Sequence, residues 1–451
     1  MKSQSKSTVK DMTDGNIAKQ LILFMVPLLI GNVFQQLYNT IDSIVVGNYV
    51  GKDALAAVTS TSPISIMLVG FFMGMSTGAS VIVSQYFGAN DKRSLTKSVH
   101  TAITLTFFLG IAFMIIGYVI TPVMLKFMAT PDTVMDDAIL YLRTYFLGIM
   151  GLMLYNMGSA ILRAVGDSKT PLYILIFSSI MNIILDLLFV IKFGLGVSGV
   201  AYATIISQFV SAIIVIGLLL KSKDIYRLRI KELGIDVYFL KKIVQIGLPA
   251  GIQTAVVSFS NVFVQSYINK FGSGAAAAWG VYGRIDAFAI LPMQSMGLSI
   301  TTFVGQNAGA GKSKRIKDGI RIALAMAIVI TAVICIPLVI FAPDIVVLFN
   351  KEAEVIAYAA LFIRVNELFD IIAVSNQIHA GALRGVGNAV IPSIVMIFSF
   401  VVFRQIYLKI VSLLTTSIIP IAWGYPAGWI CCSIILFIYF RLHDLTKISG
   451  K

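Results

Sequence analysis

Long apolar segments recur along the whole of this 451-residue chain, and they restrict its fold more than any other feature. Crossing the hydrocarbon core of a bilayer takes about 20 apolar residues, and twelve segments reach this length. Their approximate spans are 18–46, 57–80, 98–120, 138–162, 172–191, 200–220, 243–267, 279–304, 323–341, 357–383, 391–410 and 418–440. Only 12% of the residues are charged, which is typical of a membrane protein. The twelve spans leave little of the chain for soluble domains. The sequence therefore predicts an all-α polytopic membrane protein.

A formal net charge of +14 could indicate nucleic-acid binding, but the positions of the basic residues point elsewhere. When the amino terminus is placed inside, most Lys and Arg residues fall in inner loops and tails, as at Lys92, Arg93, Lys312 and Arg315. Cytoplasmic loops of membrane proteins carry this excess. We expect a multi-pass protein of a prokaryotic plasma membrane, with both termini cytoplasmic and no nucleic-acid partner.

The chain contains a parallel repeat at a fixed offset of 221 residues. The segment QYFGA at 85–89 recurs as QNAGA at 306–310, and LRAVGDSKTP at 162–171 recurs as LRGVGNAVIP at 383–392. Each copy holds six spans, so both insert in the same direction and are related by a pseudo-two-fold axis along the membrane normal. The predicted organisation is an N-terminal six-helix lobe (1–220), a cytoplasmic linker (221–242) and a C-terminal six-helix lobe (243–451).

Polar residues interrupt the apolar stretch SSIMNIILDLLFV at 178–190. Asn182 and Asp186 stand four residues apart and share one helix face, and an ionisable side chain at this depth marks a functional site. The family resemblance given below adds Asp42 and Thr204 to this pair, and depth agrees with it, because both lie about 8–9 Å below the outer end of their own spans, close to the depth of Asp186. Their oxygens suit a hard cation such as Na⁺, and two neighbouring carboxylates can also hold a proton. Interhelical hydrogen bonding is the alternative role for Asn182 and Asp186.

The repeat shows that these polar residues occur in the first half of the chain only. An offset of 221 residues carries Asp42, Asn182, Asp186 and Thr204 onto Phe263, Phe403, Tyr407 and Tyr425. The second half has therefore lost every polar ligand of the set, which favours a cation-coupling role in the first half over a packing role.

Four motifs carry a resemblance to a known family: VPLLIGNVFQQLYNTIDSIVVG at 26–47, FGAN at 87–90, LRAVGDSKTP at 162–171 and MNIILD at 181–186. With its two six-helix halves, the chain resembles the multidrug and toxic compound extrusion (MATE) antiporters over essentially its whole length. In the most similar branch, the cation site uses an Asp of helix 1, an Asn and an Asp of helix 5 and a Thr of helix 6. The resemblance therefore implies Asp42, Asn182, Asp186 and Thr204, and it implies bending of helix 1, for which Pro27 is the candidate hinge. A static kink at Pro27 stays an alternative.

Charges also lie within the spans of the second half. Arg284, Asp286, Glu367 and Asp370, together with the uncharged Tyr38 of the first half, are candidates to line a substrate cleft. An ion pair between Arg364 and Glu367, three residues apart, is the alternative for that region. Another branch of the family carries an essential carboxylate on helix 7, where this chain has only neutral polar residues, and this departure argues against a cation site in the second half.

These features predict an alternating-access antiporter that takes up H⁺ or Na⁺ and exports amphipathic, cationic organic compounds, as a monomer without a cofactor. A flippase for lipid-linked oligosaccharides is disfavoured because helices 1, 2, 5 and 6 carry no intramembrane Lys or Arg. An ion channel is disfavoured because the carboxylates form no ring. No hydrolase or protease motif indicates an enzyme, and the cysteines at 335, 431 and 432 are expected to pack as small hydrophobes. The sequence leaves the choice of ion and of substrate open.

Overall fold

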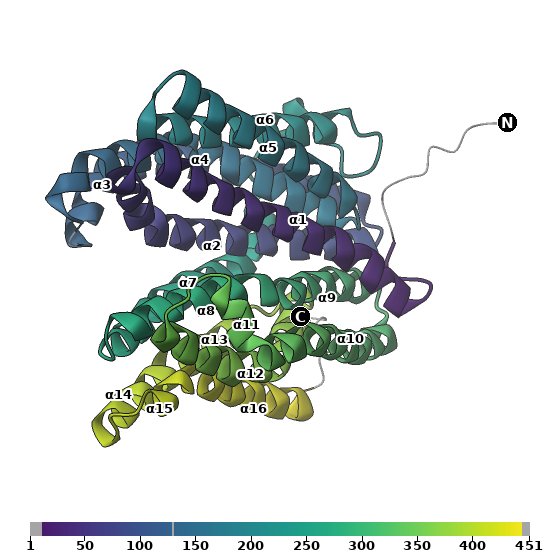
Figure 1. Cartoon of the computed structure of the whole chain (residues 1–451). Helices are drawn as coiled ribbons and strands as arrows, with labels where there is room; N and C mark the ends of the chain where they lie inside the picture. The colour runs from purple at the N-terminus through teal and green to yellow at the C-terminus, as the bar shows by residue number, and fades with distance from the viewer. Residues whose placement is uncertain (1–10, 129, 444–451) are drawn as a thin grey trace. The chain divides into compact units, whose positions relative to one another are not determined.

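The structure, a computed structural model, describes residues 11–128 and 130–443, and the regular elements of these residues are all helical (Figure 1). In the first half they are α1 (Ile17–Val45), η1 (Val46–Val50), α2 (Lys52–Gly88), α3 (Lys92–Phe127), α4 (Asp132–Ala164), α5 (Lys169–Leu187), η2 (Leu188–Lys192) and α6 (Gly196–Lys221). After η3 (Ile230–Glu232) follow α7 (Val237–Asn269), α8 (Ser273–Ala289), α9 (Leu291–Gly309), α10 (Ser313–Ile340), α11 (Ala342–Val347), α12 (Ala353–Gly385), α13 (Val390–Ile397), η4 (Phe398–Phe403), α14 (Arg404–Leu414), α15 (Ile418–Ala422) and α16 (Gly424–Leu442). The elements η1, η2 and η4 are π-helical turns, and η3 is a 3₁₀ turn.

All twelve predicted spans fall on these helices. Eleven helical segments of the described chain are long and apolar enough to cross a membrane. The remaining predicted span, 357–383, lies on α12, a helix of 33 residues that also carries three charged side chains in its middle, Arg364, Glu367 and Asp370. The span predicted at 279–304 is divided into α8 and α9 at Ile290, because Pro292 begins a new helix there.

Contacts divide the chain into two compact units. Unit 1 contains Ile30–Gly247, and unit 2 contains Met12–Leu29 together with the chain from Leu248 onward. The lobes predicted at 1–220 and 243–451 were defined by the sequence repeat, whereas the two units are defined by contacts and have other boundaries. The division into lobes therefore stays a prediction. The start of α1 belongs to unit 2, and the predicted linker, 221–242, belongs to unit 1.

In unit 1, α4 is the central helix and contacts α2, α3 and α6. The linker is held on α3 by polar contacts. The backbone N–H of Arg229 donates to Nε2 of His100 at 2.9 Å, and Lys97 Nζ lies 2.9 Å from Asp236 Oδ2. The hydrogen bond from Lys97 lowers the pKa of Asp236. These contacts explain why the linker groups with the first unit.

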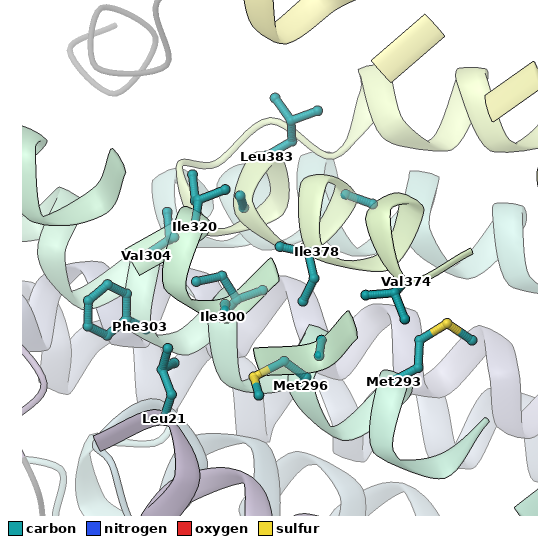
Figure 2. Close-up of a cluster of buried hydrophobic side chains, with 14 of the residues drawn as sticks. Leu21, Met293, Met296, Ile300, Phe303, Val304, Ile320, Val374, Ile378 and Leu383 are labelled. Carbon is teal, nitrogen blue, oxygen red and sulfur yellow. The ribbon is translucent and has the colours of Figure 1, made fainter. Parts of the chain in front are cut away.

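In unit 2, α12 is central and contacts α8, α9, α10 and α16. Side chains from the start of α1 complete its hydrophobic core. Figure 2 shows Leu21 beside Phe303, Ile300 and Met296 of α9, and Leu21 is fully buried. Within a bilayer such close packing, rather than removal of apolar surface from water, holds helices together, so this contact stabilises the union of α1 with the second unit.

Hydrogen bonds fix the residues before α1 on the turn between α9 and α10. The N–H of Met12 donates to Oε1 of Gln306 at 2.9 Å, and Nη1 of Arg315 donates to the carbonyl of Gly15 at 2.8 Å. Lys312 Nζ lies 2.7 Å from Asp14 Oδ1, and this hydrogen bond lowers the pKa of Asp14. Because the pair is largely exposed, the buried Met12 and the backbone bonds stabilise the segment more than the charges do.

Two glycines allow α2 and the start of α7 to touch within unit 1. A Cβ atom at Gly78 would lie 2.4 Å from the carbonyl oxygen of Ile243 and 2.6 Å from the nitrogen of Gly247. Backbone atoms cannot move aside as a flexible side chain can. Only glycine therefore fits at residue 78.

Replacing Gly78 with Val is expected to destabilise the protein by about 1–3 kcal/mol, because the new side chain overpacks this crossing. The measurement is the thermal midpoint of the purified protein in detergent. Gly217→Val is the matched control, since a Cβ atom at this helical glycine meets nothing within 4 Å. Equal midpoints for the two variants would contradict the close approach of α2 and α7.

Candidate cation site

Three helices of unit 1 carry the predicted cation residues. Asp42 lies in the last turn of α1, Asn182 and Asp186 lie one turn apart on α5, and Thr204 lies on α6. The π-helical turns η1 and η2 directly follow α1 and α5, and they contact each other. Such turns are frequent at functional sites. Here they join the two helix ends near Asp42 and Asp186.

The side chains of these residues meet in one cluster. Asp42 interacts with Asp186 and with the hydroxyl of Tyr38, and the same hydroxyl interacts with Thr204. Thr204 Oγ1 donates to the carbonyl of Val200 at 3.0 Å, which leaves its lone pairs directed away from its own helix. Tyr38, expected in a substrate cleft, is thus part of the cation cluster, and its role in the cleft stays a prediction.

Several oxygens in this cluster have no hydrogen-bond donor among the described residues. They are Oδ1 of Asp42, Oδ1 of Asn182 and both carboxylate oxygens of Asp186. Asn182 is 1% exposed and Asp186 is 0% exposed. A buried carboxylate without a partner costs several kcal/mol unless it binds a proton or a cation. The donor set therefore fits H⁺ or a hard cation such as Na⁺.

A small cavity of about 60 Å³ adjoins the cluster. Its polar wall includes Tyr38, Asn182, Thr204, Ser207, Gln208 and Ser211. The last four residues follow one face of α6 at helical spacing. A volume of this size holds a few water molecules, so the cluster has polar space around it rather than a dry core.

A second group of acidic side chains lies inside unit 2. Ligand atoms of Cys335, Glu367 and Asp370 lie within 4.8 Å of one another, and all three residues are buried. The thiol of Cys335 donates to Oε2 of Glu367 at 3.3 Å. Glu367 and Asp370 interact with each other, and no other group of the described chain donates a hydrogen bond to Oε1 of Glu367 or to the carboxylate oxygens of Asp370. Asp286 of α8 interacts with Glu367 across this group.

The arginines expected near these carboxylates lie apart from them. Arg284 and Arg364 are exposed, whereas Glu367 is fully buried. The alternative ion pair between Arg364 and Glu367 is wrong, because the exposed Arg364 and the buried Glu367 form no ion pair within the described residues. The two side chains leave α12 in different directions despite their spacing.

The repeat-related region of unit 2 has the opposite charge. Tyr425, which corresponds to Thr204, lies with its ring 4.7 Å from the guanidinium carbon of Arg404. Nη2 of Arg404 donates to Oγ of Ser260 at 3.0 Å and to Oδ1 of Asn261 at 2.8 Å. A buried cation of the protein itself therefore occupies this region, while its counterpart in unit 1 holds two carboxyl groups without a basic partner among the described residues.

A family model described as MatE matches residues 27–188 and again residues 249–408, once in each half of the chain. The chain belongs to the MATE family. The two matched ranges agree with the repeat found in the sequence. The resemblance proposed from the sequence is thereby confirmed, and the chain is a multi-pass membrane transporter rather than an enzyme.

Full-length relatives support this membership. The probable multidrug resistance protein YoeA of Bacillus subtilis (strain 168) is 31% identical over 447 residues, which cover 97% of this chain and 96% of the relative. The probable multidrug resistance protein NorM of Thermotoga maritima is 25% identical and covers 96% of this chain and 93% of its own.

A solved structure, described as the outward-facing conformation of a multidrug resistance MATE family transporter, matches with a TM-score of 0.92 at 23% identity. The match covers 99% of each chain. The predicted fold class, twelve membrane helices in two bundles, is confirmed.

Sequence reasoning about this MATE protein missed several polar residues around the two sites. Ser207, Gln208 and Ser211 could have been found from their helical spacing after Thr204. Tyr141 of α4 lies near Asp42, and Tyr145 of the same helix lies near Tyr38 and Tyr141, but no pattern in the sequence links α4 to α1. Cys335 was expected to pack as a small hydrophobe, but its thiol is a hydrogen-bond donor to Glu367.

Proposed function

We propose that this MATE protein is a cation-coupled multidrug efflux antiporter of a prokaryotic plasma membrane. It exchanges H⁺ or Na⁺ for amphipathic, cationic organic compounds by alternating access, as a monomer with both termini in the cytoplasm. The observation that carries the proposal is the set of buried, unpaired oxygens of Asp42, Asn182 and Asp186 in unit 1. The names of the multidrug resistance relatives support the substrate class.

Cation uptake changes the charge at the carboxylates of Asp42 and Asp186. An empty pair is repulsive and poorly solvated, so a proton or Na⁺ stabilises the arrangement in which the two carboxylates lie together. Asn182 and Thr204 would supply neutral oxygens to Na⁺, and the hydroxyl of Tyr38 would orient Asp42. Loss of the ion restores the repulsion and favours a different arrangement of the helices.

Helix α1 is the element through which this change would reach the second unit. The helix passes from unit 2 to unit 1 between Leu29 and Ile30, two residues beyond Pro27. Proline removes one backbone hydrogen bond of a helix and permits a bend there. We infer that Pro27 is the hinge at which α1 bends when Asp42 gains or loses its ion.

The acidic group of unit 2 is proposed to bind the cationic substrate. Asp286, Glu367 and Asp370 supply negative charge, and an aromatic cluster lies near them. The ring of Trp279 is 4.8 Å from that of Tyr282 and 5.0 Å from that of Phe362. Aromatic faces and carboxylates together suit an organic cation. Arg284, which is exposed, is proposed only as a lining residue.

Efflux from proteoliposomes with pH and Na⁺ gradients imposed separately tests the proposed coupling. A fluorescent organic cation is the substrate, and dissipation of each gradient is the control. Efflux that depends on one gradient identifies the coupling ion. Ion flux without exchange of substrate would instead support a channel, and efflux that ignores both gradients would refute the antiporter.

Tyr38→Phe is expected to lower the H⁺ concentration for half-maximal efflux by about tenfold, because the charged form of Asp42 is less stable without this hydrogen bond and a proton therefore binds more tightly. The variant loses the hydroxyl that interacts with Asp42, and a hydrogen bond to a charged group contributes about 1.5–3 kcal/mol. The measurement is the efflux rate as a function of ion concentration. Tyr49→Phe, at a tyrosine that is 60% exposed, is the matched control. An unchanged half-activation value in Tyr38→Phe would contradict a role for this hydroxyl in ion binding.

A further inference from the structure

Unit 2 contains a pocket of about 570 Å³ that neither the cation site nor the acidic group uses. It lies between the first turns of α10, the last turns of α12 and the end of α16. Its wall includes Lys317, Arg321, His379, Phe440, Arg441 and His443. The volume lies in the range of pockets that hold small ligands, so the chemistry of the wall indicates what can bind.

The pocket wall formed by the described residues is basic, since it contains Lys317, Arg321 and Arg441 and none of these described wall residues is Asp or Glu. Lys317 and Arg321 stand one turn apart on α10 and share a helix face, and Arg441 is in the last turn of α16. Neither Arg321 nor Arg441 takes part in the ion pairs found between described residues. Two guanidinium groups directed at one pocket favour a phosphate-bearing ligand.

The rest of the wall is apolar and continues onto the exposed flank of α16. Phe440, Phe437 and Leu442 line the pocket, and Phe437 and Leu442 are 53% and 74% exposed. Because α10 and α16 are membrane spans, these side chains lie where acyl chains run along the protein. A free phosphate ion would use the arginines but not this surface, whereas a phospholipid uses both.

His379 adds a polar group deep in the pocket. Its relative exposure is 8%, and its ring packs edge-on against that of Phe440, with 4.5 Å between the ring centroids. Nδ1 lies 2.7 Å from the carbonyl oxygen of Ser375, which can only accept, so Nδ1 carries a proton. In the neutral form of the ring, Nε2 is then a hydrogen-bond acceptor. An acceptor at this place suits a ligand that carries a hydroxyl group.

We propose that this pocket binds the headgroup of an anionic, hydroxyl-bearing phospholipid such as phosphatidylglycerol. Arg321 and Arg441 bind its phosphate, Nε2 of His379 accepts from a glycerol hydroxyl, and its acyl chains lie along Phe437 and Leu442. The site is separate from the proposed cation and substrate sites and does not depend on their roles.

The test is lipid binding by the full-length protein in detergent, measured by native mass spectrometry and by thermal midpoint. Phosphatidylglycerol, phosphatidylcholine and inorganic phosphate are added separately at equal concentration. We expect at least fivefold more retained phosphatidylglycerol than phosphatidylcholine, and a rise of several degrees in the midpoint with phosphatidylglycerol alone. Equal retention of both lipids, or equal stabilisation by inorganic phosphate, would overturn the proposed lipid site.

Variants of the pocket residues test whether phosphatidylglycerol binds in this pocket. Arg321→Gln and Arg441→Gln are each expected to reduce the preference for phosphatidylglycerol to twofold or less, and the use of two separate variants guards against misfolding of one. Lys314→Gln removes an exposed cation of the same helix outside the pocket and should keep the preference. His379→Phe should lower retention of phosphatidylglycerol relative to phosphatidic acid. Full preference in both arginine variants would show that the lipid binds elsewhere.

Discussion

Asp42→Asn is expected to abolish gradient-driven efflux, with a rate at least tenfold lower and equal to the rate without a gradient. Asparagine keeps the size of the side chain but cannot be charged, so the repulsion with Asp186 that an ion relieves no longer exists. Because α1 is shared between the two units, Asp42 lies on the helix that would transmit this change. The measurement is efflux of a fluorescent cation from proteoliposomes with matched protein content.

Asp137→Asn is the matched control for this variant, since Asp137 is exposed on α4 and contributes nothing to the cluster. The thermal midpoint of Asp42→Asn should equal or exceed that of the parent protein, because the substitution removes a buried charge. A folded Asp42→Asn protein that keeps gradient-driven efflux would refute the cation site. Asn182→Ala should instead weaken ion affinity while leaving some coupling, since α5 lies within unit 1 alone.

Asp370→Asn is expected to lower the apparent affinity for cationic substrates by at least tenfold, which is about 1.4 kcal/mol. The side chain is buried and forms no ion pair with a basic side chain of the described chain, so a bound organic cation would gain a direct charge partner there. Uncharged amphipathic compounds should be affected much less. The measurement is the concentration dependence of efflux for cationic and neutral compounds of similar size.

The ratio of efflux with and without an ion gradient separates substrate binding from coupling in this variant. We expect Asp370→Asn to keep that ratio and Asp42→Asn to reduce it to one. Asp344→Asn, at an exposed aspartate of α11, is the matched control. Loss of gradient dependence in Asp370→Asn would mean that the acidic group of unit 2 takes part in ion coupling, contrary to the proposal.

Much of the fold could be predicted from the sequence because it depends on local properties. Hydrophobic length alone defines the twelve spans, and the fixed offset between QYFGA and QNAGA defines the repeat. The grouping of Asp42, Asn182, Asp186 and Thr204 followed from depth along each helix and from the family resemblance. The structure brings these side chains into one cluster, while their role in coupling stays a prediction.

The sequence by itself determined where the helices run and which half holds the intramembrane carboxylates of the first cluster. Only the tertiary structure decided that the start of α1 belongs to unit 2, that Tyr38 contacts Asp42, and that Cys335 rather than Arg364 contacts Glu367. The physical reason is the distance along the chain over which each property acts. Span length and spacing act within one helix, whereas a side chain's partner depends on which other helices pack against it and on the direction in which it leaves its own.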